Sequence, residues 1–485
     1  MDIKLLKELK RYSFDELKNI FEKDDEELRD LLKNLSLMNI VKYLKSCSKF
    51  ELDELLDEDF KLNDKFDDYV FKYVGIIVVG NICLVIYPKY IEDEKSDKNY
   101  EILKQLISVI RKYQSKQQNI GFDEELELEN FNLLSVVLEL IHSYYEHGLY
   151  INENDIIEQN GEGEICWEKT INETTAYFSN NIPFYLDTFT LNQKSNKEDF
   201  FTLLHAFVLS EGCKKLKDIL NILNISPINL SLAKLDNFGT IEFIINRINQ
   251  ELSTQFITYR QNILKLLKRY IEQDSIKKTS SDISFVGTSS FNLVWEDVCS
   301  KVLDNSLEKR LEELGLHGKD GNENDGNKFL KDIIPKPKWR DVKTSSIHEA
   351  TKTLIPDIVT INKDGLSIYD AKYYTTILDE NEAKNTPGIG DITKQYFYKM
   401  AYEDFARKNN ISIKHNAFLM PTCKSNANLL GDVSLNLPGF ENSNIIDVIL
   451  LPTCKMYEYY LANKTACIKI DRDEKAAILQ SCKSL

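Results

Sequence analysis

The sequence predicts an α+β protein of several domains, and three observations lead to this fold class. The chain has 485 residues, enough for about two or three domains of the usual 100–200 residues. Its hydrophobic content of 42% can give each domain a core. Helical spacing of apolar residues dominates the middle of the chain, whereas runs rich in β-branched residues lie on both sides of it. We therefore expect a winged-helix-like domain at 1–95, a mainly helical domain at 96–280 and an α/β domain at 281–485.

The first 95 residues carry the pattern of three short helices, within 1–45, followed by a β-hairpin. Ser13 and Glu16 have the spacing of a capping box, and two apolar stripes of helical spacing lie on either side of the acidic run 24–27. The run 73–87 is β-branched with a Gly-Asn turn at its middle, which predicts the hairpin. This order is typical of a winged helix that binds DNA, and a small domain that binds a protein partner fits equally well. The acidic run argues against contact of its own face with phosphate.

The rest of the chain divides at two changes of composition. Apolar residues keep a helical spacing from about 96 to 275, apart from an Asn-rich, strand-poor break near 151–165. The polar, Ser-rich stretch 273–284 predicts a linker and the main domain boundary, and 315–345 predicts a long surface loop. In the last domain we expect helices at 291–314 and 389–409, and strands within 355–375, 413–421 and 445–452.

Charge and cysteine usage exclude several classes of protein. Sixty-one basic residues against 77 acidic ones give a net charge of −16, so any contact with nucleic acid must use a local basic surface. The sequence shows neither the apolar core of a signal peptide nor an apolar run that could cross a bilayer, so we expect a cytoplasmic protein without a membrane partner. The nine cysteines and six histidines are scattered, which argues against a zinc site or a disulfide framework.

The segment 355–373 is the most informative for function. Two apolar runs flank Asp364-Gly365, a strong hairpin signal, so Asp357 opens one strand and Asp370 lies near the end of the next. Because side chains alternate along a strand, Asp370 and Lys372 share one face of an otherwise apolar strand. Two charges there are costly unless they pair, bind a metal or take part in chemistry.

Pairing across this hairpin can bring the carboxylates of Asp357 and Asp370 together. Two such carboxylates repel each other unless a divalent cation lies between them, which suits Mg²⁺. The metal could polarise a phosphodiester and lower the pKa of a bound water, while Lys372 holds that water or stabilises the transition state. A structural hairpin with an exposed salt bridge would have the same spacing, so the pattern alone leaves both interpretations open.

The spacing of these residues resembles the signature of the PD-(D/E)XK nuclease superfamily, whose core is a mixed sheet flanked by helices. The matching residues are Pro356-Asp357, twelve further residues, and then Asp370-Ala371-Lys372. Together with the segment 285–299 (FVGTSSFNLVWEDVC), they are more specifically similar to the LlaJI family of restriction endonucleases. The segments 73–77 and 163–171 are also similar to McrC-type subunits.

The resemblance implies Mg²⁺-dependent cleavage of double-stranded DNA in a prokaryotic defence system, with a cognate methyltransferase that protects the host. In this scheme Asp357 and Asp370 are metal ligands and Lys372 is the catalytic lysine. Glu296, in the helix before the motif, has the place of a further acidic ligand. The alternative for Glu296 is a solvated glutamate beside a core tryptophan.

Two further groups of residues are candidates for contact with DNA. Gln395 lies on the helix after the motif, where some relatives carry a QxxxY pattern; Lys399 stands in place of that tyrosine, which leaves Gln395 a backbone or phosphate contact. A basic cluster surrounds Trp339, at Lys331, Lys336, Lys338, Arg340 and Lys343. It concentrates positive charge beside the predicted active site, although a solvated loop is equally consistent. His348 could approach the scissile phosphate, or it could have only a structural hydrogen bond.

Three functions remain open from the sequence. The first is a type II restriction endonuclease, acting as a dimer on DNA because cutting both strands takes two active sites. The second is an McrC-like nuclease subunit that depends on an McrB-like GTPase or ATPase; the chain itself has no Walker A sequence, so such a motor must be another protein. The third is a non-catalytic DNA-binding regulator. Besides these three, a PD-(D/E)XK enzyme that acts on another nucleic acid, such as a repair or transposition nuclease, is a further alternative.

Overall fold

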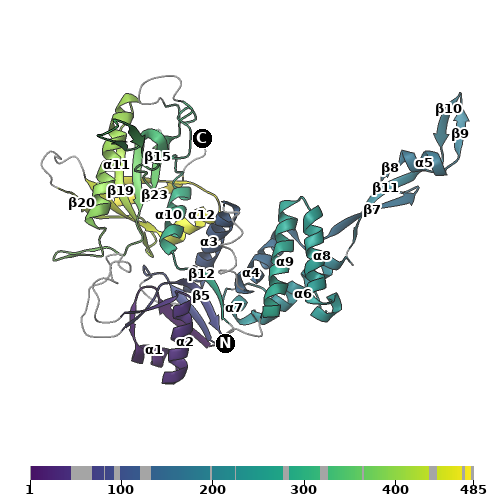
Figure 1. The fold of residues 1–485 in the computed structure, drawn as a ribbon, viewed down its shortest axis with the longest axis horizontal. Helices are drawn as coiled ribbons and strands as arrows, with labels where there is room; N and C mark the ends of the chain where they lie inside the picture. Colours follow the sequence, from purple (N-terminus) through teal and green to yellow (C-terminus); the bar gives the residue numbers. More distant parts are fainter. Residues whose placement is uncertain are drawn as a thin grey trace. The chain divides into compact units, whose positions relative to one another are not determined.

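The computed structural model describes residues 2–44, 68–80, 82–91, 99–120, 133–196, 199–223, 225–276, 283–316, 326–362, 365–435, 445–471 and 476–481. Helices and strands are mixed along the chain, which confirms the α+β class. The chain forms two compact units (Figure 1): residues 123–286 with residues 1 and 78–81, here the helical unit, and residues 2–77, 82–122 and 287–485, here the sheet unit. These units cut across the three ranges expected from the sequence, whose separate roles stay predictions.

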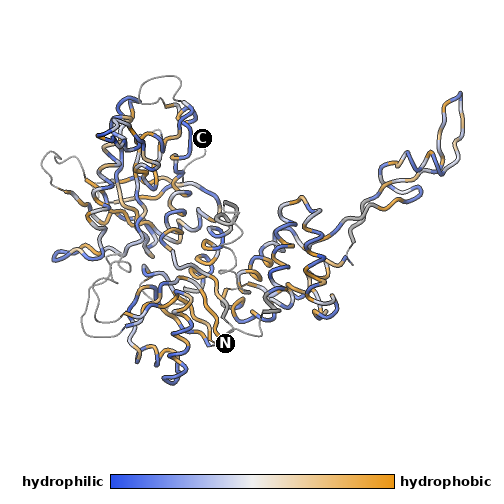
Figure 2. Tube along the Cα trace, viewed as in Figure 1, coloured by the Kyte–Doolittle hydropathy of each residue, from blue (hydrophilic) through white to orange (hydrophobic). Residues whose placement is uncertain are grey.

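The helices of the helical unit bury their apolar faces against one another, and hydropathy alternates along them in Figure 2. Gly212 of α6 lies where an added Cβ would meet the Val137 side chain of α4 at 2.7 Å, so glycine lets these two helices approach closely. No helix within the described ranges combines the length and hydropathy needed to cross a bilayer. The elements are α4 (Leu133–His147), α6 (Phe200–Lys215), α7 (Lys217–Ile222), η1 (Leu235–Phe238), α8 (Ile241–Thr254) and α9 (Thr258–Ile276).

Between α4 and α6 the chain forms a β-rich arm, residues 152–196, which the sequence analysis did not predict. Two long strands pair antiparallel along their whole length and carry a short helix and a terminal hairpin outward (Figure 1). The strand-poor break expected near 151–165 is therefore wrong, because a polar strand shows no apolar alternation and its partner lies far along the chain. The elements are β7 (Asn152–Gln159), β8 (Glu164–Ile165), α5 (Trp167–Glu173), β9 (Ala176–Ser179), β10 (Ile182–Tyr185) and β11 (Phe189–Asn196).

The N-terminal part of the sheet unit has two helices rather than three. The first expected helix is instead a strand, β1, which pairs in parallel with β6. The second and third expected helices are confirmed as α1 and α2, with the capping box at Ser13 and Glu16, and the expected hairpin at 73–87 is confirmed as β5 and β6. The elements are β1 (Asp2–Lys7), β2 (Arg11–Ser13), α1 (Phe14–Phe21), α2 (Asp25–Leu37), β3 (Val41–Leu44), β4 (Asp68–Phe71), β5 (Val74–Val79), β6 (Ile82–Tyr87), in sheets β1-β6-β5-β12 and β2-β4-β3.

The C-terminal part is built on a five-stranded mixed sheet of order β15-β16-β19-β21-β20. The three middle strands run parallel and are almost entirely buried, and both edge strands are antiparallel to their neighbours. The expected strands and the long helix are confirmed as β15 (Ile358–Asn362), β16 (Gly365–Ala371), α11 (Ile389–Lys408), β19 (Ile413–Thr422) and β21 (Ile446–Pro452). The antiparallel edge strand β20 (Asn428–Val433) was not expected.

Helices and short strands surround this mixed sheet. α3 packs against both α10 and α12, so residues 99–120 belong with the C-terminal sheet rather than with a helical middle domain. α10 ends at Val302 and not at residue 314 as expected, because Asp304 takes a left-handed conformation (φ 56°). The elements are α3 (Asn99–Ile120), β12 (Ile283–Thr288), α10 (Phe291–Val302), η3 (Leu330–Ile333), β13 (Lys338–Arg340), β14 (Ile347–Glu349), β17 (Ile377–Leu378), β18 (Ala383–Lys384), α12 (Thr453–Leu461), β22 (Ala466–Asp471) and β23 (Ala476–Ser481).

Candidate active site

The β15–β16 hairpin brings Asp357 and Asp370 together, as the sequence predicts. Ile358 pairs with Tyr369, so Asp357 comes opposite Asp370 in the next step of the ladder. The Asp357 carboxylate also accepts a hydrogen bond from the backbone N–H of Ala371, at 3.1 Å between Oδ2 and N. Gly365 opens β16 at φ 142°, and a Cβ there would meet the Ser412 carbonyl oxygen at 2.4 Å. Asp364 of the expected turn lies outside the described residues.

The two aspartates lie close together, with Asp370 buried and Asp357 half-buried. Asp370 is only 7% exposed, on a strand whose every residue is buried. Burial, the charges of Asp370 and Glu296, and a hydrogen bond to the Asp370 carboxyl together raise the pKa of Asp357 to about 8. Two bare carboxylates placed close together repel each other, and a bound proton or cation relieves that repulsion. The geometry therefore concentrates negative charge at one point.

Lys372 lies between two carboxylates, directly after β16. Its Nζ is 3.0 Å from Asp370 Oδ2 and 2.9 Å from Asp391 Oδ1. Burial alone would lower the pKa of Lys372, but these carboxylates outweigh it and raise the pKa, so the side chain stays a cation. Sequence reasoning found Lys372 and missed Asp391. The available signal was that acidic residues favour the first turn of a helix, and Asp391 is in the first turn of α11.

Glu296 projects from α10 toward the same carboxylates. It is half-buried, and burial together with the charge of Asp370 raises its pKa. Cys299 lies one turn further along α10 and is fully buried; burial and the charges of Asp357 and Glu296 raise the pKa of its thiol well above the usual range. The thiol of Cys299 is therefore neutral and serves as a core side chain beside the site.

Backbone and side-chain hydrogen bonds hold the strands and the helix of this site in position. Asn305 donates to the Asp357 carbonyl oxygen (2.8 Å) and accepts from the N–H of Val359 (3.1 Å), so it holds both sides of the start of β15. The Leu419 carbonyl oxygen accepts from the Trp295 indole (3.1 Å) and from the N–H of Lys372 (2.9 Å). One acceptor on β19 thus positions both the helix that carries Glu296 and the end of β16. None of these contacts follows from a local sequence pattern.

The residue after the lysine ties the site to the N-terminal part of the sheet unit. The Tyr373 hydroxyl donates to Glu8 Oε2 at 2.5 Å, and the backbone N–H of Lys89 lies 3.2 Å from the same oxygen. Glu8 and Tyr373 are both buried, and the Lys89 ammonium lies 4.8 Å from the centre of the Tyr373 ring. The N-terminal strands are therefore part of the support of the site.

Gln395 does not reach a DNA-facing surface. Its side chain is fully buried, and its amide donates to Asn416 Oδ1 (2.9 Å) and to the Ile368 carbonyl oxygen (3.4 Å). Gln395 therefore contacts a backbone carbonyl oxygen of the protein itself and not a phosphate of DNA. It joins α11 to β16 and β19 and corrects the expectation of a DNA contact, since a buried amide cannot touch a phosphate outside.

The predicted basic cluster forms an exposed hairpin, apart from one of its members. Lys331 is paired with Glu308 at 2.7 Å and is largely neutralised. The other members lie on or beside β13 and β14 and are exposed: Lys336, Lys338, Arg340 and Lys343. His348 is exposed on β14, opposite Trp339, and its Nε2 lies 3.3 Å from the Ser346 hydroxyl. This favours the structural interpretation of His348.

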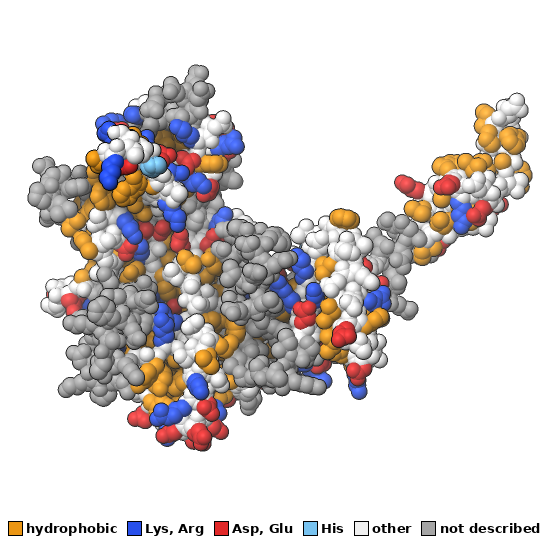
Figure 3. Space-filling view, in the orientation of Figure 1, with side chains coloured by type: hydrophobic (Ala, Val, Ile, Leu, Met, Phe, Trp, Pro, Cys, Tyr) orange, Lys and Arg blue, Asp and Glu red, His pale blue; other side chains and the backbone are white. Residues whose placement is uncertain are grey.

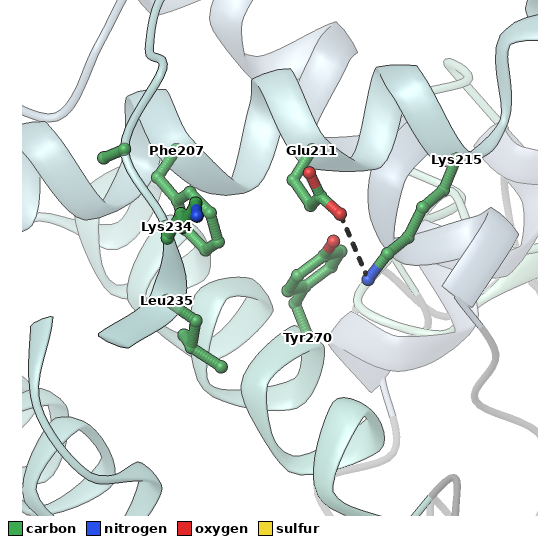
Figure 4. A pocket seen from close by; sticks show the side chains of 7 residues that line it. Phe207, Glu211, Lys215, Lys234, Leu235 and Tyr270 are labelled. Carbon is green, nitrogen blue, oxygen red and sulfur yellow. Dashed lines mark ion pairs between the residues drawn. The ribbon is translucent and has the colours of Figure 1, made fainter. Parts of the chain in front are cut away.

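A pocket lies apart from this site, in the helical unit (Figure 4). It includes an ion pair between Glu211 and Lys215 at 3.8 Å, and the Lys215 ammonium lies 5.4 Å from the centre of the Tyr270 ring. The remaining lining residues are Phe207, Ala233, Lys234 and Leu235. No residue predicted to carry chemistry lines it.

The donor set at the sheet edge suits a hard divalent cation. Among the residues that the structure describes, no group of three or more His, Cys, Asp or Glu side chains is arranged as a complete metal cage. Mg²⁺ does not need one, because it is usually held by one or two carboxylates and completes its shell with water and substrate phosphate. The convergent carboxylates of Asp357 and the buried Asp370 therefore fit Mg²⁺.

Comparison with known proteins assigns the chain to a family. The family described as LlaJI restriction endonuclease matches residues 73–315 and 322–451, which is most of the chain. The chain belongs to the LlaJI restriction endonuclease family. It is therefore a nuclease of the restriction–modification type, which confirms the resemblance seen in the sequence motifs.

The LlaJI family member is similar to a curated protein and to chains of solved structures. It is 28% identical over 418 residues to the "Type II restriction enzyme BsuMI component YdjA" of Bacillus subtilis (strain 168), covering 83% of each chain. A chain of the refined half-complex of Thermococcus gammatolerans McrB AAA+ hexamers with bound McrC matches with 14% identity and a TM-score of 0.34, covering 95% of this chain and 99% of that chain. A chain of the cryo-EM structure of the Thermococcus gammatolerans McrBC complex matches with 14% identity and a TM-score of 0.17, covering 57% and 87%.

Proposed function

We propose that this protein is a Mg²⁺-dependent endonuclease of the PD-(D/E)XK type that cleaves double-stranded DNA at a specific sequence. The observation that carries the proposal is the convergence of Asp357, Asp370 and Lys372 at one edge of a buried mixed sheet. A charged trio in such a setting is costly to fold and is typical of a catalytic site. A regulator would have no need of it.

In this proposal Asp357 and Asp370 hold the metal, and Glu296 is a further ligand or binds a metal-bound water. The cation, when bound, would polarise a phosphoryl oxygen and lower the pKa of an attacking water. Asp357, whose pKa is raised in the metal-free site, would hold the cation as a deprotonated carboxylate. Lys372 keeps its charge and donates to the attacking water or to a phosphate oxygen, where negative charge develops in the transition state. Asp391 restrains the ammonium so that little reorganisation is needed.

The DNA itself would be held by the exposed cations near the site. Lys336, Lys338, Arg340 and Lys343 offer phosphate contacts that fix the register of the duplex. Cleavage of both strands takes two such sites, so we propose that the protein acts as a dimer on DNA. A cognate methyltransferase would protect host sites, as the restriction–modification assignment implies.

A second arrangement is favoured by the exposed surface of the arm. Apolar side chains lie along its outer part, at Phe178, Ile182, Phe184 and Leu186 (Figure 3). Apolar side chains that gather on a projecting element mark a contact with another protein. The Bacillus subtilis relative is named as a component of its restriction enzyme. We therefore propose, as the alternative, that cleavage needs a partner, and an McrB-like GTPase or ATPase is the candidate.

The test is cleavage of unmethylated phage DNA by the purified chain in Mg²⁺. Wild type should give discrete fragments, and EDTA should abolish them. Asp370→Asn and Lys372→Ala should each bind the DNA without cutting it. Lys384→Ala serves as the matched control, because Lys384 is an exposed lysine of the same unit that pairs with Glu382. It should cut like wild type.

Other outcomes separate the alternatives. If wild type cuts only after an NTPase partner and GTP or ATP are added, and Phe178→Ser in the arm does not cut even with these additions, the partner-dependent arrangement is correct. If no addition produces cutting, and DNA binding is the same in wild type and Asp370→Asn, the protein is a regulator. Unspecific digestion of every duplex would contradict site-specific cleavage.

A further inference from the structure

The β13–β14 hairpin presents apolar side chains to solvent on a projecting tip. Trp339 is 70% exposed and Val342 is 93% exposed, values that leave almost no contact with the rest of the chain. Trp339 pairs across the hairpin with His348, which is also exposed. Every residue of both strands is exposed, so both faces of this short ribbon are uncovered. A soluble protein has no folding benefit from apolar groups placed in this way.

The turn at the tip is preorganised. Asp341 accepts hydrogen bonds from the N–H of Lys343 (2.9 Å) and the hydroxyl of Thr344 (2.6 Å), and its own N–H donates to the Ser346 carbonyl oxygen (2.9 Å). The carboxylate of Asp341, the single acidic side chain of the turn, is therefore occupied by hydrogen bonds within the turn. These bonds hold Val342 at the outer end of the hairpin. The exposure of Val342 is thus a result of a defined conformation.

The base of the hairpin is anchored in the core that backs the active site. Leu330 and Ile333 of η3 are buried in one cluster with Val359 of β15 and Ile368 of β16. The Thr353 hydroxyl donates to the Pro335 carbonyl oxygen at 2.8 Å, which closes the base. A force on the tip would therefore act on the same core that positions Asp357 and Asp370.

The net positive charge of the hairpin indicates the kind of partner that it binds. Between 335 and 352 stand the cations Lys336, Lys338, Arg340, Lys343 and Lys352, against the carboxylates of Asp341 and Glu349. Within the described residues, none of these five cations forms an ion pair. The whole chain carries −16, so this local excess of unpaired positive charge complements a polyanion.

We propose that the β13–β14 hairpin is a DNA wedge, in which Trp339 and Val342 enter the base stack of the duplex held for cleavage. The inference rests on the proposed nuclease function and adds to it an element that deforms the substrate. Its cations contact the phosphates on either side, while the two apolar side chains part neighbouring bases. The bend or opening produced in this way brings the scissile phosphate to the carboxylates.

The first experiment follows the fluorescence of Trp339 in the full-length chain. The sequence has three tryptophans, of which Trp295 is fully buried, so Trp167→Phe leaves Trp339 as the exposed emitter. The probe is a random-sequence duplex in Ca²⁺, with a gel to verify that it stays intact. Stacking on bases should quench Trp339 and shield it from acrylamide. An unquenched, acrylamide-accessible Trp339 in the bound complex overturns the wedge.

The second experiment separates stacking from charge. Trp339→Ala and Val342→Ser should weaken binding, for Trp339→Ala by on the order of ten- to a hundredfold, and leave the slope of log affinity against log salt unchanged. Lys338→Ala should instead reduce that slope by about 0.9. Ile377→Ser is the control, since Ile377 is an apolar residue that is 51% exposed on another hairpin of the same unit, and it should bind like wild type.

Failure of the wedge and failure of the proposed function give different results. If wild type binds and cuts DNA while Trp339→Ala and Val342→Ser match the control, the nuclease stands and the wedge is wrong. If wild type binds no duplex at all, the proposed function itself fails, and the wedge with it. If Trp339 is shielded without DNA and in proportion to protein concentration, the hairpin is a contact between protein chains and the wedge is again wrong.

Discussion

Two β-hairpins that follow each other in the sequence treat their charges in opposite ways. In β15–β16 the charged groups are buried and bonded, since Asp370 is 7% exposed and lies 3.0 Å from Lys372. In β13–β14 the cations Lys338 and Arg340 are exposed, and neither forms an ion pair within the described residues. This difference indicates that the charges of the two hairpins have different roles. A buried charge has a folding cost that chemistry can justify, whereas an exposed, unpaired cation is available to a ligand.

The largest effect is expected from Asp370→Asn. It removes one of the two convergent carboxylates, so cleavage should fall on the order of 10³-fold, about 4 kcal/mol in the barrier. The fold should not suffer, because the repulsion with Asp357 is relieved and Lys372 keeps Asp391. Cleavage rate and melting temperature measure the two effects.

A metal readout makes this prediction independent of activity. Mg²⁺ should raise the melting temperature of wild type, since a ligand that binds only the folded state stabilises it, and should not raise that of Asp370→Asn. Equal Mg²⁺ stabilisation of both proteins would contradict the metal site at the β15–β16 hairpin. Loss of the folded state in Asp370→Asn without metal would show instead that the charges are structural.

The next largest effect concerns a buried ionisable group without any counter-charge. His205 is fully buried in α6; its Nδ1 accepts from the N–H of Tyr150 at 3.0 Å, and burial lowers its pKa to about 4. In the unfolded chain a histidine takes up a proton near pH 6.5, whereas the folded chain protonates His205 only near pH 4. The contribution of the neutral, buried His205 to the free energy of unfolding is therefore complete above pH 6.5 and is lost as the pH falls toward 4. The loss is about 3 kcal/mol.

Chemical denaturation of wild type and His205→Asn between about pH 4 and 7 measures this loss. The difference between the two curves should shrink as the pH falls, because the variant has no imidazole to protonate. A difference in free energy of unfolding that is constant with pH would mean that His205 can be charged in the folded protein. Burial would then not be enough to keep an ionisable side chain neutral, and the contrast between buried and exposed charges would fail.

The sequence predicted the elements whose signals are local. Ser13 and Glu16 form the capping box that their spacing indicates, and the motif hairpin has the register that places Asp357 beside Asp370. The apolar, β-branched strands of the mixed sheet were visible for the same reason, since burial on both faces leaves a continuous apolar run. The candidate catalytic trio could therefore be predicted almost completely.

The elements that were missed depend on partners far along the chain. β1 does not show the apolar alternation of a strand, because Lys4 is buried within it and Glu8 is buried directly after it; these side chains are paired with Glu22 and Tyr373. Its parallel partner β6 lies some eighty residues further on. The arm was missed for a similar reason, because polar strands are stable there only through each other. Asp391 was missed because no spacing rule joins it to Lys372.

A smaller effect is expected from Tyr373→Phe, which extends the comparison to the support of the buried hairpin. The substitution leaves the buried Glu8 carboxylate without the hydroxyl that donates to it at 2.5 Å. The free energy of unfolding should fall by about 1–3 kcal/mol. Cleavage should fall less than in Asp370→Asn, through a lower kcat with little change in KM, because Tyr373 positions Lys372 and touches no substrate. Adding Glu8→Gln to Tyr373→Phe removes the buried charge that has lost its donor and should restore most of the stability.

The smallest effect is expected from Arg340→Ala, on the exposed hairpin. DNA affinity should fall by about 1 kcal/mol, and the slope against log salt should decrease by about 0.9, as for the loss of one phosphate contact. The melting temperature should not move, because Arg340 is exposed and forms no ion pair within the described residues. Filter binding at several salt concentrations and thermal unfolding measure the two quantities, with Lys384→Ala as the control for a lost exposed cation. A lower melting temperature with unchanged DNA affinity would mean that Arg340 stabilises the fold, as the charges of the β15–β16 hairpin do. The contrast between the two hairpins would then be wrong.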